Sequence, residues 1–193
     1  MKSKYLFIDC ETGGLDPLKN ALLQVACIAE IDGKEVGRYD FKMKPIPGKE
    51  IDKEALDVTG LLLKDIAKYE PSATVFKQFV KMLDSYINKY DSTDKFQVIA
   101  YNSPFDLSFI KEWFIDNKHD YLFSYGHYPW IDIPVLVSVL TEGQRDKIPN
   151  FKQGTIAKAL GIEVVEDRLH DAMYDVELAR DIFHIIKDEF IKL

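Results

Sequence analysis

The sequence predicts an α/β fold in which a mixed five-stranded sheet is flanked by helices. An Asp32-Gly33 dipeptide between two apolar runs is typical of an antiparallel hairpin. Further along the chain, short apolar runs alternate with segments whose apolar residues recur at helical spacing. A hairpin followed by alternating strands and helices indicates a mixed sheet covered by helices.

The five expected strands are short apolar runs bounded by turn residues. The first stops at Asp9, before a glycine-rich turn, and the next two flank the hairpin dipeptide. The fourth, "FQVIAYN", and the fifth, "YPWID", each precede a helical segment. In chain order these strands are residues 4–9, 22–31, 37–43, 96–102 and 128–132.

The expected helices are identified by apolar spacing and by their first residues. One begins near Asp52, one begins with "SPFDLSFIKEWF", and one runs from the fifth strand to Leu140. Asn102 and Ser103 are the alternative caps of the second of these. Two longer helices, residues 71–90 and 170–191, carry the stripes Val75, Phe79, Met82, Leu83, Tyr86, Ile87 and Ala172, Val176, Ala179, Phe183, Ile186.

Length and composition fit a single domain, residues 1–193, without disulfides. Of its 193 residues 47% are hydrophobic, which is enough for a full core. Cys10 and Cys27 lie in apolar runs and are interpreted as buried thiols of a reducing compartment. No stretch approaches the ~20 apolar residues that span a membrane, and the N-terminal run is too short for a signal peptide. We therefore expect a soluble cytoplasmic protein with no membrane partner.

The formal net charge of −7 argues against a broad basic surface for nucleic acid. It does not exclude an enzyme that grips a few nucleotides at a metal site, because bound cations supply positive charge locally.

The stretch "YLFIDCETGG" places two carboxylates at the end of the first strand. Residues i and i+2 of an extended chain point to the same side, so Asp9 and Glu11 lie side by side. Carboxylates that close repel each other, and a cation between them removes the repulsion. This pair alone is also compatible with a solvated strand end.

Further acidic residues lie where they can join this pair. Asp106 follows the fourth strand in the first turn of a helix, and a plain helix-dipole role is the alternative for it. Asp175 lies between Ala172 and Ala179 of the buried stripe, where an unpaired carboxylate is costly. His170, five residues earlier, is either a site residue or a surface residue at the helix start.

Four carboxylates and one histidine suggest hydrolysis at a metal centre. All-oxygen ligation suits Mg²⁺ or Mn²⁺. Two such ions ~3.5–4 Å apart stabilise both the attacking and the leaving oxygen of a phosphodiester displacement. An imidazole titrates near neutral pH, so His170 is the candidate general base that takes a proton from water.

Three ordered motifs resemble those of the DEDDh 3′–5′ exonucleases, the family of bacterial polymerase proofreading subunits, ribonuclease T and oligoribonuclease. The family pattern Asp-x-Glu-Thr-x-Gly matches residues 9–14, "DCETGG". An Asn followed after a short gap by Phe-Asp matches residues 102–106, "NSPFD", and His-x₄-Asp matches His170 to Asp175. Each motif alone is weak, whereas the ordered set spans nearly the whole chain.

The resemblance implies a ribonuclease H-like fold and metal-dependent release of nucleoside monophosphates from a 3′ end. It implies that Asp9, Glu11 and Asp175 hold the first of two Mg²⁺ or Mn²⁺ ions. Asp9 would also touch the second ion, which Asp106 contacts directly or through water. The implied partners are single-stranded DNA or RNA 3′ ends and a polymerase or other tethering protein.

The resemblance also implies a subsite for the terminal nucleotide. The family uses backbone around Thr12 and Gly13 there, and Asn102 of the second motif is assigned to substrate binding with them. The segment "VTGL", residues 58–61, stands where the family has Val-His-Gly-Ile, which gives Leu61 the nucleotide-packing position. Gln24 stands where the family often has a glutamate that contacts the 3′-hydroxyl.

Several alternatives remain open from the sequence. Asp167 and Asp171 compete with Asp175 for the last ligand position, and Asp132 is interpreted as a helix cap. The "HD" pair at 170–171 suggests an HD-type phosphohydrolase, which requires a mainly helical fold. A non-catalytic binding module is a third class. DNA is favoured over RNA as substrate, although no motif encodes a contact to the 2′-hydroxyl.

Overall fold

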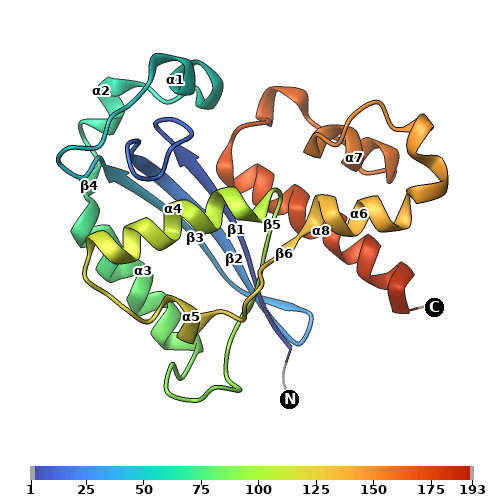
Figure 1. The fold of residues 1–193 in the computed structure, drawn as a ribbon, viewed down its shortest axis with the longest axis horizontal. Helices are drawn as coiled ribbons and strands as arrows, with labels where there is room; N and C mark the ends of the chain where they lie inside the picture. Colours follow the sequence, from blue (N-terminus) through green and yellow to red (C-terminus); the bar gives the residue numbers. More distant parts are fainter. Residues whose placement is uncertain (1–2, 192–193) are drawn as a thin grey trace.

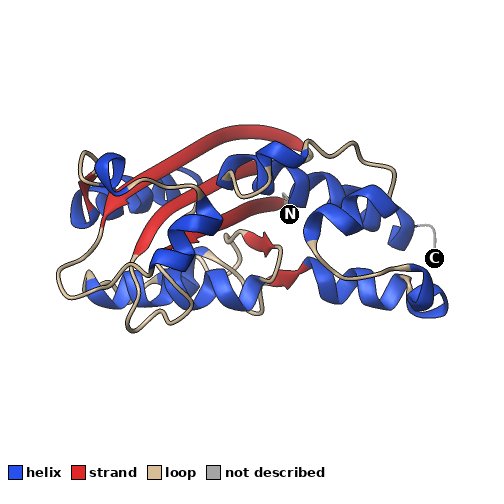
Figure 2. Cartoon of the chain, turned by 90° about the horizontal axis from the view of Figure 1, so that it is seen from above, coloured by secondary structure: helices blue, strands red, loops and turns tan. Residues whose placement is uncertain are grey.

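A computed structural model describes residues 3–191, which form one mixed sheet between two layers of helices (Figures 1 and 2). The strand order is β4-β3-β2-β1-β5-β6. The antiparallel strands β1, β2 and β3 adjoin parallel β5 and β6, while β4 pairs in parallel with β3. The bounds are β1 Lys4–Thr12, β2 Leu22–Ile31, β3 Lys34–Lys44, β4 Glu70–Pro71, β5 Gln97–Ala100 and β6 Ile131–Asp132.

The predicted mixed sheet is therefore confirmed, with one strand more than expected. The additional strand, β4, has only two residues and includes a proline, so neither length nor alternation identifies it. The hairpin between β2 and β3 turns at Asp32 and Gly33, which have φ values of 49° and 75°. Positive φ at both positions is the requirement that favours Asp-Gly in a two-residue hairpin.

Eight α-helices occur in the described chain, and the expected ones are present within a few residues. The short helices α2, α5 and α7 were not predicted, because four to seven residues carry too little periodicity. The bounds are α1 Lys53–Thr59, α2 Leu63–Ile66, α3 Ser72–Tyr86, α4 Ser103–Asp116, α5 Leu122–Tyr125, α6 Ile133–Leu140, α7 Gln153–Ala159 and α8 Ala172–Ile191, with 3-10 turns at Glu142–Lys147 and Glu166–Arg168. None of the helices within residues 3–191 combines the length and apolarity needed to cross a bilayer.

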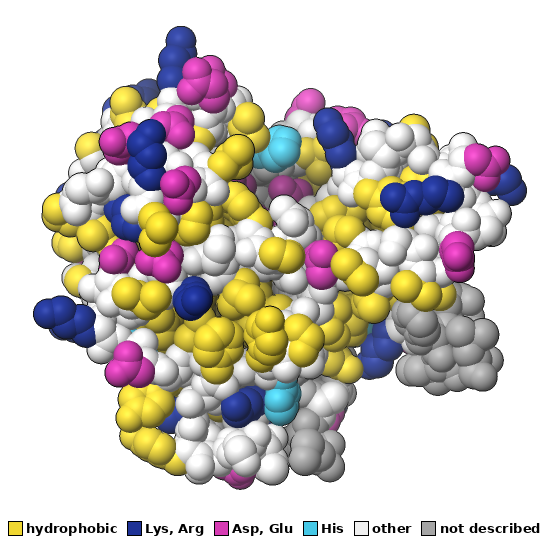
Figure 3. Space-filling view, viewed as in Figure 1, with side chains coloured by type: hydrophobic (Ala, Val, Ile, Leu, Met, Phe, Trp, Pro, Cys, Tyr) yellow, Lys and Arg dark blue, Asp and Glu magenta, His cyan; other side chains and the backbone are white. Residues whose placement is uncertain are grey.

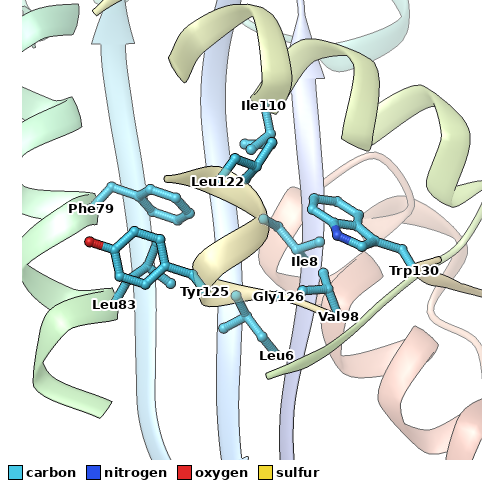
Figure 4. Close-up of a pocket in the computed structure, with 10 residues that line it drawn as sticks. All are labelled: Leu6, Ile8, Phe79, Leu83, Val98, Ile110, Leu122, Tyr125, Gly126 and Trp130. Atoms are coloured by element: carbon cyan, nitrogen blue, oxygen red, sulfur yellow. The ribbon is translucent and has the colours of Figure 1, made fainter. Parts of the chain in front are cut away.

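The two faces of β1 belong to different cores. Leu6 and Ile8 point toward α3, α4 and α5, where they surround a void of about 20 Å³ together with Phe79 and Trp130 (Figure 4). Phe7 points to the opposite face, which α6, α7 and α8 cover. Because Asp9 follows Phe7 at a spacing of two, it lies on the α8 face.

Strand β1 runs three residues beyond its expected end. Asp9 was expected to be its last residue, but Glu11 pairs with Gln24 and Thr12 pairs with Leu22. The register shifts between Glu11 and Thr12, which is a β-bulge. Pairing with β2 supplies the hydrogen bonds that keep residues 10–12 extended. A local sequence pattern does not indicate such pairing with a distant strand.

The start of α4 is capped from a neighbouring strand. Asn102 occupies the N-cap position with φ 66°, but its side chain makes no capping bond. The backbone N–H of Ser103 instead donates to Oδ1 of Asp132, at 3.0 Å. Asp132 is thus a cap, as expected, but it caps α4 through space rather than the helix that follows it, and the expectation that Asn102 or Ser103 caps α4 by side chain is wrong.

We expect Ser72→Ala to lower the free energy of unfolding by about 1–3 kcal/mol. The buried Trp113 indole donates its N–H to the Ser72 hydroxyl at 2.8 Å, and the substitution leaves that donor without a partner. Urea denaturation measures the change. In the control Ser138→Ala, the lost hydroxyl donates only to Val135 in its own helix, so a change within about 0.5 kcal/mol is expected. Equal effects of the two substitutions would contradict the role given to the indole bond.

Candidate active site

Three carboxylates converge between the central strand and the last helix. Asp9 and Glu11 of β1 and Asp175 of α8 each offer an oxygen, and these oxygens lie within 4.8 Å of one another. Strand alternation turns Asp9 and Glu11 to the same face, and α8 packs on that face with its buried stripe. The structure thus brings together three of the acidic residues that the sequence predicts as ligands.

Asp106 is the fourth carboxylate of this cluster, although its oxygens are not among those that lie within 4.8 Å of one another. It occupies the first turn of α4 and is only 2% exposed. Its charge raises the pKa values of both Asp9 and Glu11. Since α4 covers the other face of β1, Asp106 approaches the cluster from the side of Cys10, with which it is in hydrogen-bond contact.

Burial and the repulsion of neighbouring carboxylates raise the pKa values of all four carboxyl groups and so favour their protonated forms. Burial is the largest cause for each. It raises the pKa of Glu11 to about 8, with the charges of Asp175 and Asp106 adding to the shift. The pKa of Asp106 is raised to about 8, that of Asp175 to about 6, and that of Asp9 well above its ordinary value. Four such groups in one place favour either protons or a cation.

The hydrogen bonds of Asp175 leave one oxygen for a cation. Its Oδ2 accepts the backbone N–H of His170 at 3.1 Å. Its Oδ1 is buried and has no hydrogen-bond partner within the described part of the chain. A buried acceptor without a partner is costly, and metal coordination satisfies it. Together with the all-oxygen donor set, this fits a hard divalent cation such as Mg²⁺ or Mn²⁺.

His170 lies on an exposed bend immediately before α8. It has φ 71°, a left-handed conformation that is uncommon outside glycine. It lines a depression together with Gln24, Thr59 and Leu61, so the 58–61 segment and the third motif face each other across it. Figure 3 shows a hollow between the α1–α2 region and the α7–α8 region, with acidic side chains on its floor and a histidine at its edge.

A groove of about 390 Å³ opens next to the carboxylates. Glu11 and Thr12 form one side of it, and Val58 of α1 forms part of another. Leu15 lines the groove while being 84% exposed, so its side chain is available to an apolar ligand surface. Phe105 of α4 also lines it, although the sequence left its role unassigned.

The glycine turn after β1 is organised by contacts that the sequence did not reveal. Gly13 donates its N–H to Ala21 and accepts from the N–H of Asp52, both at 2.7 Å. A Cβ at Gly13 would lie 2.7 Å from the Glu50 carbonyl oxygen, so the close approach requires glycine. Asn20, 3% exposed, ties the turn by donating from Nδ2 to Gly13 and to the Asp52 carboxylate. An isolated asparagine in a polar loop carries no signal for this role.

Two of the four predicted substrate-binding residues, Thr12 and Leu61, line the groove or the depression. Thr12 lines the groove, whereas Gly14 rather than Gly13 stands among its described lining residues. Leu61 lines the depression that holds His170. Asn102 is exposed at the start of α4 and lies outside the described lining of both hollows.

Asp171 has a different task from Asp175. Its Oδ1 accepts the backbone N–H of Tyr174 at 2.9 Å, which is an N-terminal cap of α8. The structure therefore assigns Asp175, not Asp171, to the cluster that contains Asp9 and Glu11.

Gln24, which stands where the family often has a glutamate, donates its side-chain amide N–H to the Asp40 carboxylate at 2.8 Å.

The mixed sheet thus carries a carboxylate cluster near the end of β1, with a donor set suited to a divalent cation. The family model RNase_T, described as Exonuclease, matches residues 6–183. The chain belongs to this exonuclease family.

Relatives and solved structures agree with the family match. The chain is 26% identical over 185 residues to the DNA polymerase III PolC-type of Mycoplasmopsis pulmonis (strain UAB CTIP), covering 95% of this chain. It is 27% identical over 191 residues to that of Streptococcus pyogenes serotype M2 (strain MGAS10270), covering 97% of this chain. It spans only 11% of the length of each of these relatives.

Among solved structures, E. coli exonuclease I in complex with a dT13 oligonucleotide has a similar fold. The TM-score is 0.77 at 23% identity, and the match covers 96% of this chain and 41% of that one. The predicted resemblance and the ribonuclease H-like fold are thus confirmed. The HD-type phosphohydrolase interpretation is wrong, because the chain has a mixed sheet and belongs to the exonuclease family.

Without metal, we expect the free energy of unfolding to fall by at least about 1 kcal/mol from about pH 5 to about pH 8. Raised carboxyl pKa values mean that the folded chain binds more protons than the unfolded chain. Their stabilisation is present below the unfolded pKa and is lost as pH rises through about 6 for Asp175 and about 8 for Glu11 and Asp106. Urea denaturation in chelator at several pH values measures it.

Two controls isolate the cluster in this experiment. Asp106→Asn should flatten the pH dependence, and saturating Mg²⁺ should reduce it because the cation binds the folded chain. Burial lowers the pKa of His119, so this residue makes the free energy of unfolding rise with pH at the acidic end of the range. His119 is present in both the wild type and Asp106→Asn, so its effect cancels in the comparison. Stability of the metal-free wild type that rises over the same range would refute the assignment.

Proposed function

We propose that the chain is a metal-dependent 3′–5′ exonuclease. It hydrolyses the terminal phosphodiester bond of single-stranded nucleic acid, with DNA favoured, and releases nucleoside 5′-monophosphates. The observation that carries the proposal is the set of Asp9, Glu11 and Asp175 oxygens within 4.8 Å of one another, beside an open groove. We assign this activity to residues 1–193 as a single exonuclease domain.

The carboxylates have separate tasks in this proposal. Asp9, Glu11 and Asp175 would hold the first of two Mg²⁺ or Mn²⁺ ions, and Asp106 and Asp9 would hold the second. When bound, the cations offset the carboxylate charges and stabilise the negative charge that develops on the phosphate. Two observations support this assignment: the Oδ1 of Asp175 has no hydrogen-bond partner among residues 3–191, and the pKa values of the cluster are raised.

His170 acts as the general base and accepts a proton from the attacking water. Its exposure lets the imidazole meet solvent, and its backbone N–H anchors it to Asp175. Thr12, Gly13, Leu61 and Asn102 are retained as substrate-binding candidates. We add Leu15, Val58 and Phe105 to them, since they give the groove beside Glu11 an apolar wall for a base or sugar.

The relatives support DNA as the favoured substrate. PolC-type relatives are DNA polymerases, and exonuclease I of E. coli was solved with a DNA oligonucleotide. A net charge of −7 gives weak, salt-sensitive binding, so we propose that a polymerase or another partner tethers the chain to its substrate. The alternative is an exoribonuclease that acts on RNA or short oligoribonucleotides.

We place the protein in the cytoplasm. Cys10 and Cys27 are both free and buried, which fits a reducing compartment.

The direct test uses DNA and RNA single strands labelled at either end, with matched blunt duplexes. With Mg²⁺ or Mn²⁺, we expect mononucleotide release from the 3′ end, faster on single-stranded DNA and abolished by chelator. Blunt duplex should be slower because extracting a paired terminal base costs a few kcal/mol. Early release of a 5′ label as mononucleotide, or full activity in chelator, would overturn the proposal. Faster release from RNA would favour the exoribonuclease.

The ligand assignment is tested by a matched pair of substitutions one helical turn apart. Asp175→Asn should lower the rate at least ~10³-fold. When several groups act as one unit, the loss of any one of them removes nearly the whole rate enhancement of the set. Asp171→Asn should keep a rate near that of the wild type, since asparagine also caps the Tyr174 N–H. Calorimetric titration with Mn²⁺ should show weakened binding for Asp175→Asn alone. The reverse ranking would transfer the ligand role to Asp171.

A further inference from the structure

The segment 165–171, here called the His170 loop, contains the 3-10 turn Glu166–Arg168 and leads into α8. It carries the proposed base, and most of its residues are exposed. His170 adopts φ 71°, which for a residue with a side chain persists only when neighbouring contacts enforce it. The position of the imidazole therefore depends on what attaches this loop to the rest of the molecule.

Tyr174, in the first turn of α8, makes several of these attachments. Its hydroxyl accepts the backbone N–H of Val165 at 2.8 Å, where the loop begins. Its ring lies under the guanidinium of Arg168, 4.4 Å from the ring centre. Its backbone N–H donates to Asp171 at the end of the loop. Tyr174 is 7% exposed, so these contacts start from a side chain that packing holds in place.

The other attachments belong to the cluster or to the middle of the loop. The His170 N–H donates to Asp175, so loop and ligand share one bond. Leu169 packs against Gly154 of α7. A Cβ added at Gly154 would lie 3.3 Å from Cδ1 of Leu169. The Tyr174 hydroxyl is thus a restraint on the loop that can be removed without altering a carboxylate or the histidine.

We propose that Tyr174 is a positioning residue, which holds the His170 loop so that the imidazole stays beside the carboxylate cluster. This inference rests on the proposed function, because it gives Tyr174 its effect through the general base. Tyr174 acts at the start of the loop, through Val165 and Arg168, while Asp175 and the Asp171 cap fix its end.

The test uses Tyr174→Phe, which keeps the buried ring and removes only the hydroxyl. Hydrogen exchange of the Val165 amide, measured in chelator, should accelerate about 5-fold, the net worth of one hydrogen bond. With Mg²⁺ and single-stranded DNA, kcat should fall about 3- to 10-fold. KM and the Mn²⁺ affinity from calorimetry should stay within about 2-fold, because no ligand is changed.

A double-mutant cycle separates positioning from a general loss of structure. In a His170→Ala background, adding Tyr174→Phe should change kcat by less than about 1.5-fold, since the group that it positions is gone. The matched control is Tyr125→Phe, which removes a hydroxyl that donates to Asp84 of α3 on the other side of the sheet. It should leave kcat and Val165 exchange unchanged.

Each outcome decides a specific statement. An unchanged Val165 exchange rate, or equal losses of kcat from Tyr174→Phe with and without His170, would overturn the role of Tyr174. An active wild type whose kcat is unaffected by Tyr174→Phe would overturn it as well. A wild-type chain that degrades no labelled strand would instead overturn the proposed function. Exchange of the Val165 amide is measured without activity, so the two failures are distinguishable.

Discussion

The constraint on which this structure depends is the repulsion among four carboxylates that the fold forces together. Asp9 and Glu11 are side by side on β1 because of strand alternation, and Asp175 and Asp106 reach them from helices on opposite faces of the sheet. The repulsion is offset by apolar packing elsewhere. β1 is bonded on both edges and buried on both faces, so the strand cannot move to separate its charges. A bound cation would offset the repulsion, so the carboxylates are already gathered where a cation can bind.

Acidic residues near the cluster divide into two kinds according to their hydrogen bonds. Asp132 and Asp171 each accept a backbone N–H at a helix start, and these bonds hold α4 and α8 in place. Those two helices carry Asp106 and Asp175, so the capping acids stabilise the helix starts on which the clustered acids lie. Asp175 retains an oxygen with no partner among the described residues. Partnered acids therefore build the site, and the acid with an unused oxygen is the one available to a ligand.

Sequence predicted the parts of this arrangement that depend on local periodicity. The stripe of α8 and the hairpin at Asp32 follow from spacing and turn chemistry, and three of the clustered acids follow from strand and helix periods. The parts that depend on distant partners were missed or misplaced. The extension of β1 comes from pairing with β2, the cap of α4 comes from Asp132 on another strand, and the glycine turn is tied by Asn20. A single sequence holds no record of which distant backbone group a polar side chain meets.

The two halves of the proposed reaction rest on elements of different rigidity. The carboxylates stand on a central strand and on the first turns of two long helices, where packing leaves little freedom. The proposed base stands on an exposed bend that hydrogen bonds from its own helix hold in place. Val58 borders both the groove and the depression of His170, so an occupant of the groove touches the same segment that faces the base. In the proposed reaction a substitution in the loop therefore changes turnover and leaves metal affinity intact, whereas a substitution of a carboxylate in the rigid part changes both.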